Sequence, residues 1–381
     1  MNKNLFKVSR ELQNVFSKQF IRRVSFRTKF VQRRNKLNEE EFLALCVFYN
    51  NDLCRSSLSQ LSAKLASNEN INISKQGLHA KFSPNAVKFM RQMFDAGLKN
   101  QNKILYENSA LINTYFNRIR IADSTSFVLP KEFQDYYSGF FSNGTESCAK
   151  IQLEYDLNTG AFIHYAVMDG NLSDSHYLPN MYNDIKPKDL HIKDLGYYDT
   201  YYLKLISQMG AFFLSRLKTG INIYRKDRNE FKKINILDIS KNLSKGDILE
   251  INEAYISKNH KLKCRLIINK LTEEQERKKI ESMIRKSKKK CKKSGPMYQK
   301  FNDINIYITN IPAEIVDKDK IYKLYSIRWQ IEIMFKIWKS IFKIHASKKV
   351  KIERFQCCLY GKLISILLTS DIFFTVKKNA M

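Results

Sequence analysis

The chain has 381 residues, of which 44% are hydrophobic, and this content excludes wholesale disorder and predicts roughly two or three structural units. Its 66 lysines and arginines stand against 37 aspartates and glutamates, which gives a formal net charge of +29 and an isoelectric point near 9.7. Such an excess of positive charge, spread along the chain, indicates a polyanionic partner, and nucleic acid is the first expectation.

An anionic membrane surface is the competing interpretation of this charge. No segment approaches about 18 uninterrupted apolar residues, and residues 1–10 lack the apolar core of a signal peptide. The C-terminal LISILLTSDIFF contains Asp371 and is therefore expected to form a buried helix. The seven cysteines form no C-x-x-C pair and have no histidines at metal-ligand spacing, which argues against a zinc site or a disulfide framework and favours a reducing, cytoplasmic setting.

Residues 1–105 are expected to be helical, because they contain almost no proline or glycine. Two short periodic segments, Ser57–Leu65 and Ser74–Phe82, are joined by an asparagine-rich turn, and Ser74 is a plausible N-cap. This is the outline of a helix-turn-helix, although ordinary helical bundles share it. The second helix would offer four side chains to DNA: Lys75, Gln76, His79 and Lys81.

From about residue 117 the pattern changes to strands. Ile119, Ile121 and Asp123 alternate onto one face, so that Asp123 is expected at the end of its strand. A hairpin is predicted to turn at Asn158–Gly160, and a later short strand ends at Asp194. The order of strands and helices predicts an α/β fold, a mixed sheet flanked by helices.

A helix over Tyr198–Met209 and a strand over Ala211–Lys218 are expected next. Arg216 and Lys218 lie on the same face of that strand, which suits contact with a DNA backbone; an exposed edge strand is the alternative. Residues from about 220 to 305 predict a strand-rich insertion with strands in INIYR, KINILDI, GDILEINEAYI and KLKCRLIIN, followed by a charged helix. The basic run from Arg285 to Pro296 is expected to be flexible and solvated.

The segment YSIRWQIEIMFKIWKS, Tyr325 to Ser340, predicts one amphipathic helix. Its polar side chains fall within an arc of about 60° at 100° per residue; they are Tyr325, Arg328, Glu332 and Lys339. The opposite face is expected to pack on a core and carries Ile327, Ile331, Met334, Ile337, Trp338 and Ile341. The plainest interpretation of the polar stripe is a surface ion pair between Arg328 and Glu332.

A second interpretation links this helix to the two aspartates. Asp123 and Asp194 each follow a predicted strand, and Glu332 would add a third carboxylate from the helix. Three carboxylates can hold two hard cations such as Mg²⁺ about 4 Å apart, a pair that activates water and stabilises the leaving oxygen in phosphoryl transfer. Arg328, Lys339 and Tyr325 would then bind phosphates beside the metals.

The spacing Tyr325-x2-Arg328-x3-Glu332-x6-Lys339 resembles the Tyr-Arg-Glu-Lys signature of DDE transposases of the insertion-sequence-four type. IADSTSF resembles the block around the family's first aspartate, and IKDLGYYD with FFLSRLK resembles the second. The resemblance implies an RNase H-like catalytic domain over 106–381, interrupted by a β-strand-rich insertion, and an α-helical N-terminal DNA-binding region. It further implies Asp123, Asp194 and Glu332 as the catalytic triad.

The same resemblance implies two Mg²⁺ ions, with Mn²⁺ able to replace them, and double-stranded DNA as the partner, both element ends and target. A bacterial transposase of this kind would bind terminal inverted repeats as a homodimer in a synaptic complex, cut the strands and join them to target DNA. Two alternatives remain open at this point. One is a non-catalytic DNA-binding regulator derived from a transposase; the other is an RNase H-like nuclease without strand transfer.

Overall fold

The computed structural model describes residues 16–31, 36–107, 115–140, 144–228, 230–257, 259, 261–290 and 302–379. The chain divides into two compact units. Unit 1 consists of Met1–Leu111, Ser124–Leu172 and Glu332–Met381, and unit 2 of Ile112–Asp123 and Ser173–Ile331. Strand β1 (Arg118–Val128) and helix α13 (Trp329–Ser340) each contribute residues to both units.

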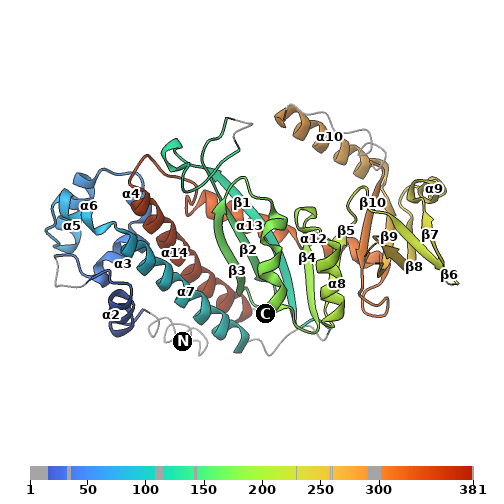
Figure 1. Ribbon diagram of the computed structural model, residues 1–381, viewed down its shortest axis with the longest axis horizontal. Helices are drawn as coiled ribbons and strands as arrows, with labels where there is room; N and C mark the ends of the chain where they lie inside the picture. The colour runs from blue at the N-terminus through green and yellow to red at the C-terminus, as the bar shows by residue number, and fades with distance from the viewer. Residues whose placement is uncertain are drawn as a thin grey trace. The chain divides into compact units, whose positions relative to one another are not determined.

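The other elements of unit 1 are α2 (Lys18–Arg27), α3 (Glu39–Phe48), α4 (Asn50–Leu53), α5 (Leu58–Glu69), α6 (Lys75–Lys81), α7 (Pro84–Glu107), the short 3-10 helix η1 (Lys131–Phe133), β2 (Cys148–Asp156), β3 (Phe162–Asp169) and α14 (Ile352–Asn379). The long helices α7 and α14 lie side by side (Figure 1), and α14 also packs on α3 and α4. Helix α14 thus packs on helices that lie far before it in the sequence.

Unit 2 holds η3 (Asp174–Asp184), β4 (Asp189–Lys193), η4 (Leu195–Tyr197), α8 (Thr200–Gln208), β5 (Phe212–Arg216), β6 (Ile223–Asp227), β7 (Glu230–Ile234), α9 (Ile236–Lys241), β8 (Ile248–Ile256), β9 (Leu262–Lys270), α10 (Glu273–Lys290), β10 (Ile304–Thr309) and α12 (Lys318–Ser326).

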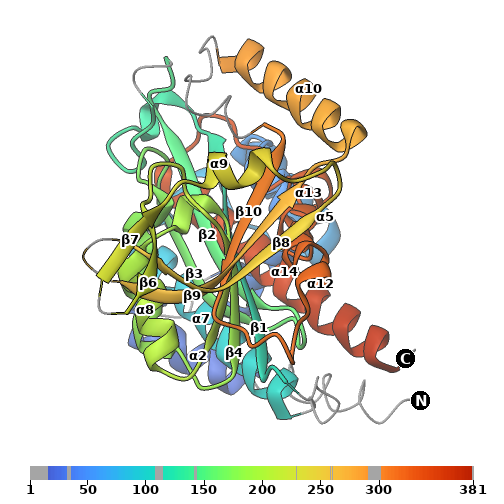
Figure 2. The same ribbon diagram turned by 90° about the vertical axis from the view of Figure 1, so that its right-hand side faces the viewer.

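The strands follow the order β3-β2-β1-β4-β5-β10-β9-β8-β6-β7 in one mixed sheet. Strands β1 and β4 are parallel neighbours (Figure 2). Strand β5 is parallel to β4, and β10 runs antiparallel to β5 and β9. This arrangement confirms the predicted α/β class with an RNase H-like mixed sheet flanked by helices, and strands β6 to β9 confirm the strand-rich insertion. The division into domains at about residue 105 stays a prediction.

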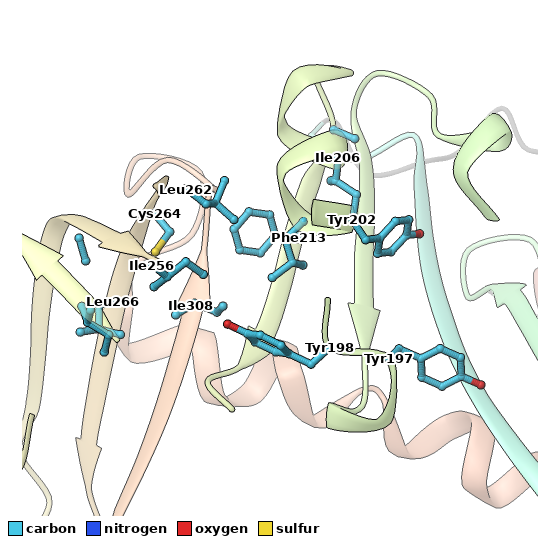
Figure 3. Close-up of a cluster of buried hydrophobic side chains, with 14 of the residues drawn as sticks. Tyr197, Tyr198, Tyr202, Ile206, Phe213, Ile256, Leu262, Cys264, Leu266 and Ile308 are labelled. Atoms are coloured by element: carbon cyan, nitrogen blue, oxygen red, sulfur yellow. The ribbon is translucent and has the colours of Figure 1, made fainter. Parts of the chain in front are cut away.

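The core of unit 2 is a continuous apolar cluster on the strands that α8 covers (Figure 3). Tyr202 and Ile206 of α8 lie over Phe213 of β5, and Ile308 of β10 continues the cluster toward β9. In unit 1 an aromatic cluster joins the N-terminal helices, with Phe30 stacked on Phe89 at 5.0 Å between ring centroids. No helix in the described part of the chain has both the length and the apolarity needed to cross a bilayer.

Several local predictions are confirmed. Helices α5 and α6 form the expected pair, and the Ser74 hydroxyl accepts a hydrogen bond from Gly77 N at 3.1 Å, as an N-cap does. The hairpin between β2 and β3 turns through Gly160, whose φ of +79° is in the region that only glycine adopts without strain. The helix expected over Tyr198–Met209 is α8.

Two local predictions are wrong. Asp123 does not end its strand, because β1 continues to Val128 as the neighbour of β2. The segment KINILDI is not one strand: Asn235 caps a short helix by accepting from Leu237 N, and α9 begins at Ile236.

The flexibility expected of the basic run Arg285–Pro296 stays a prediction. The run begins inside α10, which extends to Lys290, and residues 291–296 lie outside the described residues.

The helix predicted over Tyr325–Ser340 is also wrong as a single element. Helix α12 ends at Ser326 and α13 begins at Trp329, with Ile327 as the C-cap. The turn between them is tightened to i→i+3 hydrogen bonds, including Arg328 N to Tyr325 O at 3.2 Å. Because of the break, the buried face of α13 differs from the predicted one. Ile331, Phe335 and Trp338 are buried, whereas Ile337 and Ile341 are exposed.

Candidate active site

The two aspartates are brought together by the pairing of β1 and β4. These strands are parallel neighbours, and their register pairs Ile121 with Ile192 and Ala122 with Lys193. The next positions along the two chains are Asp123 and Asp194, which follow the last registered pair. Because successive side chains alternate across a strand, both aspartates belong to the face of Ile121 and Ile192. The short strand predicted to end at Asp194 is β4, which ends one residue earlier, at Lys193.

An ion-pair array on the opposite face of the same strands fixes this register. Arg118 and Asp189 are partners in the β1–β4 pairing, and Arg118 Nε donates to Asp189 Oδ1 at 2.8 Å. Arg120, fully buried, donates from Nη1 to Asp189 Oδ2 at 3.3 Å and to the carbonyl of Asp184 at 2.6 Å. Removing one partner of such a buried pair leaves an uncompensated charge, so the array opposes any slip of the two strands.

Lys193 extends this buried polar layer to the position beside Asp194. Its ammonium donates to the Tyr202 hydroxyl at 2.9 Å, and that hydroxyl lies 3.2 Å from His191 Nδ1. The sequence reasoning missed this whole array. A signal was present, since Arg118, Arg120, Asp189, His191 and Lys193 occupy alternate positions of predicted strands, where apolar residues would be expected of a buried face.

Arg328 forms an ion pair with Asp123. Its Nη1 lies 3.2 Å from Asp123 Oδ2, and the two side chains are only 10% and 18% exposed. The guanidinium comes from the turn between α12 and α13, so the break in the predicted helix is what directs it to β1. The polar stripe expected on a solvated surface is therefore partly buried: Arg328 and Tyr325 are each only 9% exposed.

Tyr325 lies in the electrostatic field of the same group of residues. Burial raises the pKa of Tyr325 to about 12, and the negative charge of Asp194 adds to the rise, while Arg328 and Arg216 oppose it. The ring packs against Tyr307 of β10 at 5.3 Å between centroids. The phenol is therefore protonated at neutral pH and can act only as a hydrogen-bond donor or neutral acceptor.

Glu332 and Lys339 belong to unit 1, on α13. Glu332 lies in the first turn of the helix and is partly exposed. Lys339 Nζ donates to the carbonyl of Ser126 at 3.1 Å, and burial lowers the pKa of Lys339. Trp338 anchors this helix within the unit through its contact with Phe162, at 5.8 Å between ring centroids.

Arg216 and Lys218 border a cavity of about 290 Å³ in unit 2. Leu195, the residue after Asp194, also lines it, together with aliphatic side chains from β6, β7 and β10. Lys279 of α10 contributes a further cation. The cavity thus combines an apolar wall with a cationic rim at one residue from Asp194.

The residues predicted on the N-terminal helix pair differ in their surroundings. Lys75, Gln76 and His79 are exposed on α6. Lys81 is not directed to solvent in the same way, because its ammonium donates to the carbonyl of Leu37 at 2.6 Å and lies 5.7 Å from the ring centroid of Phe30. Burial lowers the pKa of Lys81. The contacts of Lys81 are those of a residue that ties α6 to the helices beneath it.

A divalent metal needs oxygen donors that are accessible and close together. Asp123 and Asp194 are partly exposed, so both carboxylates are accessible. They also follow neighbouring positions of the β1–β4 pairing. Across the residues that the structure describes, no group of three or more His, Cys, Asp or Glu side chains is close enough to hold a metal ion. The donor chemistry of the two aspartates fits a hard cation, with further ligands needed from elsewhere.

Comparison with known proteins identifies the family. A family model described as the transposase DDE domain matches residues 114–368. The chain is 40% identical to the transposase for insertion sequence element IS1151 of Clostridium perfringens, over 99% of this chain and 82% of that protein. It is 34% identical to the transposase for insertion sequence element IS231E of Bacillus thuringiensis subsp. finitimus, over 97% and 80% of the two chains. These matches show that the chain belongs to the DDE transposases of the insertion-sequence-four type.

Proposed function

We propose that this transposase binds the terminal inverted repeats of its element and cuts there with Asp123, Asp194 and Glu332 as the catalytic triad. The proposal is supported chiefly by the register of β1 and β4, which brings Asp123 and Asp194 to adjacent positions. Glu332 follows Arg328, the partner of Asp123, by four residues along the chain. The family implies dependence on a divalent metal; we propose two Mg²⁺ ions held by these three carboxylates, with Mn²⁺ able to replace them.

Bound metal would supply activation of the attacking oxygen and charge stabilisation of the leaving one. In the proposed reaction, water attacks the phosphorus at the element end and the P–O bond to the 3′ oxygen breaks, which leaves a 3′-hydroxyl. That hydroxyl then attacks a phosphorus of the target DNA and displaces its 3′ oxygen. Ion pairs on the other face of β1 and β4 hold these two strands in register, which supports fixed positions for Asp123 and Asp194 during the proposed reaction.

Phosphate binding is proposed for five side chains near these carboxylates in the chain or in space. Arg328 offers a planar guanidinium that suits a phosphate bidentately, and Tyr325 a neutral hydroxyl. Lys339 contributes a cation from α13, and Arg216 and Lys218 contribute cations from the lining of the cavity.

Lys75 and Gln76 of α6 are proposed to contact the inverted repeats, with Lys81 serving mainly to hold that helix in place. Assembly as a homodimer on two element ends completes the proposal.

Single substitutions Asp123→Asn, Asp194→Asn and Glu332→Gln test the triad. Each amide keeps the shape of the side chain and removes a charged oxygen ligand, so metal-dependent cleavage of a duplex carrying the element end should fall by at least about 10³-fold. End binding, measured by fluorescence anisotropy, should stay within about twofold of wild type. Asp238→Asn on α9, far along the chain from the three, is the matched control and should cleave normally. Near-normal cleavage by any of the three variants would remove that residue from the triad.

A further inference from the structure

We propose that Arg328 is the counter-ion of the metal-free site, so that it competes with the divalent metal for Asp123 and leaves it when a DNA phosphate binds. The inference rests on the proposed function, in which Asp123 is a metal ligand. It adds a coupling that the triad alone does not contain: metal and DNA would each strengthen the binding of the other through one arginine.

The contact that carries the inference is direct. Arg328 Nη1 lies 3.2 Å from Asp123 Oδ2, and both side chains are largely shielded from water. Shielding strengthens a charge-assisted hydrogen bond, because water no longer competes for either partner. A dication that binds Asp123 needs the same carboxylate oxygens, and it would also be repelled by a cation held within hydrogen-bond distance of them.

The same guanidinium influences the surroundings of the second aspartate. Arg328 and Asp194 act on the Tyr325 hydroxyl with opposite sign, so both charges lie near that hydroxyl. The positive charge of Arg328 thus pairs with Asp123 and lies near a hydroxyl that the charge of Asp194 also reaches. In the absence of metal it offsets part of the negative charge of the site.

A phosphate offers Arg328 a second anionic partner. Guanidinium groups bind phosphate oxygens bidentately, and a long arginine side chain can turn toward one without movement of the backbone. The backbone here is held by the tight turn between α12 and α13, in which Arg328 O accepts from Ile331 N at 3.3 Å. When a phosphate takes the guanidinium, the Asp123 oxygen is released for metal; by linkage, metal at Asp123 releases Arg328 for phosphate.

The test measures metal affinity of the DNA-free, full-length protein, with Mn²⁺ as the probe and the free ion counted by electron paramagnetic resonance. Arg328→Gln should bind Mn²⁺ at least about tenfold more tightly than wild type, the factor that corresponds to loss of about 1.4 kcal/mol of competing interaction. Arg277→Gln on α10 removes one exposed arginine from the same unit and serves as the charge-matched control, with unchanged affinity. Equal or weaker Mn²⁺ binding by Arg328→Gln would overturn the inference.

Thermal melts give a second readout that does not depend on catalysis. Without metal, Arg328→Gln should melt below wild type because the ion pair between Arg328 and Asp123 is lost. Added Mn²⁺ should raise its melting temperature by more than it raises that of wild type, whereas an arginine with a purely structural role would give equal shifts. If Arg328→Gln does not fold at the assay temperature, Arg328→Lys takes its place. Its Mn²⁺-induced rise in melting temperature should also exceed that of wild type, by a smaller amount.

Asp123→Asn separates failure of the inference from failure of the proposed function. Weaker Mn²⁺ binding by Asp123→Asn, together with unchanged binding by Arg328→Gln, would keep Asp123 as a ligand and reject only the competition. Unchanged Mn²⁺ binding by Asp123→Asn would reject the proposed ligand itself.

Discussion

Lys279 shows how much a single buried charge depends on its neighbours. Its ammonium donates to the carbonyl of Ile304 at 2.7 Å and to Asn305 Oδ1 at 3.2 Å. The pKa of Lys279 is lowered to about 8, chiefly by burial and also by the nearby guanidinium of Arg216, while Asp303 and Glu276 partly compensate. Two cations beside one cavity are unfavourable until an anion joins them, which agrees with the proposed phosphate contact of Arg216.

This residue predicts a pH dependence of stability with a definite sign. Below about pH 8 Lys279 is protonated in the folded and unfolded states, and the folded state bears the cost of a buried charge. Between about pH 8 and the ordinary lysine pKa near 10.4, the folded protein has lost this proton and the unfolded chain has kept it, so stability from this group rises with pH. The free energy of unfolding of wild type is compared with that of Lys279→Met, which lacks the titrating group and therefore its pH-dependent contribution to stability.

Urea unfolding of both proteins at pH 7 and pH 10 gives the measurement. The free energy of unfolding of wild type, relative to Lys279→Met, should increase from the lower to the higher pH. All other titrating groups are common to the two proteins and cancel in the difference. A constant difference would show that Lys279 keeps an ordinary pKa in the folded protein.

At the scale of elements, unit 1 depends on a close approach of two helices. A Cβ at Gly361 of α14 would overlap the backbone carbonyl of Cys46 on α3. The absence of a side chain there lets α14 lie directly on α3, where Cys46, Cys357 and Cys358 are all buried. A rigid carbonyl cannot move away as the end of a flexible side chain can.

Gly361→Ala should therefore destabilise the protein by about 1–3 kcal/mol, because α14 must shift away from α3. Gly97→Ala on α7 is the matched helical control. A Cβ at Gly97 would meet Leu367 Cδ1 at 3.6 Å, an ordinary contact, and alanine favours a helix over glycine by up to about 1 kcal/mol. In thermal or urea unfolding, Gly361→Ala should be less stable than wild type and Gly97→Ala more stable. Equal effects would show that the contact between α14 and α3 is looser than described.

The break between α12 and α13 is an element-scale difference between sequence and structure. A single helix over 325–340 satisfied the periodicity of the sequence, but it placed Ile337 on the packed side, and Ile337 is 42% exposed. A count at 100° per residue assumes an unbroken helix, and no proline or glycine in the sequence marks the break at Ile327. The turn instead contains Tyr325 and Arg328, which are both buried, and Arg328 pairs with Asp123.

At the scale of the whole molecule, unit 1 is a compact unit made of segments that are far apart in the sequence. Helix α14 supplies hydrogen bonds that close the N-terminal helices: Arg354 donates to the carbonyls of Leu53, at 2.7 Å, and Ser56, at 2.6 Å. Cys358 Sγ donates to the carbonyl of Asn50 at 3.1 Å. The predicted N-terminal region, residues 1–105, therefore leaves part of its packing surface to a helix near the other end of the chain.

A fragment of residues 1–105 should consequently be helical but poorly packed. It should bind the dye ANS, melt without a sharp transition and bind DNA with little preference for the element ends. A tethered version that adds residues 350–379 should melt cooperatively and bind the ends better than random DNA, with affinity that falls steeply as salt rises. A sharp melt of the fragment alone would show that these residues form an independent domain, as the sequence predicts.

The sequence by itself determined the features that depend on neighbouring residues and on composition. These are the excess positive charge, the α5–α6 pair with its Ser74 cap, the hairpin turn through Gly160, the position of Asp194 after its strand, and the spacing from Tyr325 to Lys339 that indicated the family. The tertiary structure alone decided the adjacency of Asp123 and Asp194, the buried array of Arg118 and Asp189, and the Arg328 ion pair. Caps, turns and periodicity act within a few residues and can be read along the chain. Register, burial and ion pairing join residues far apart in the sequence, such as Asp123 and Arg328, which are 205 positions apart, and they are fixed only when the strands and helices pack together.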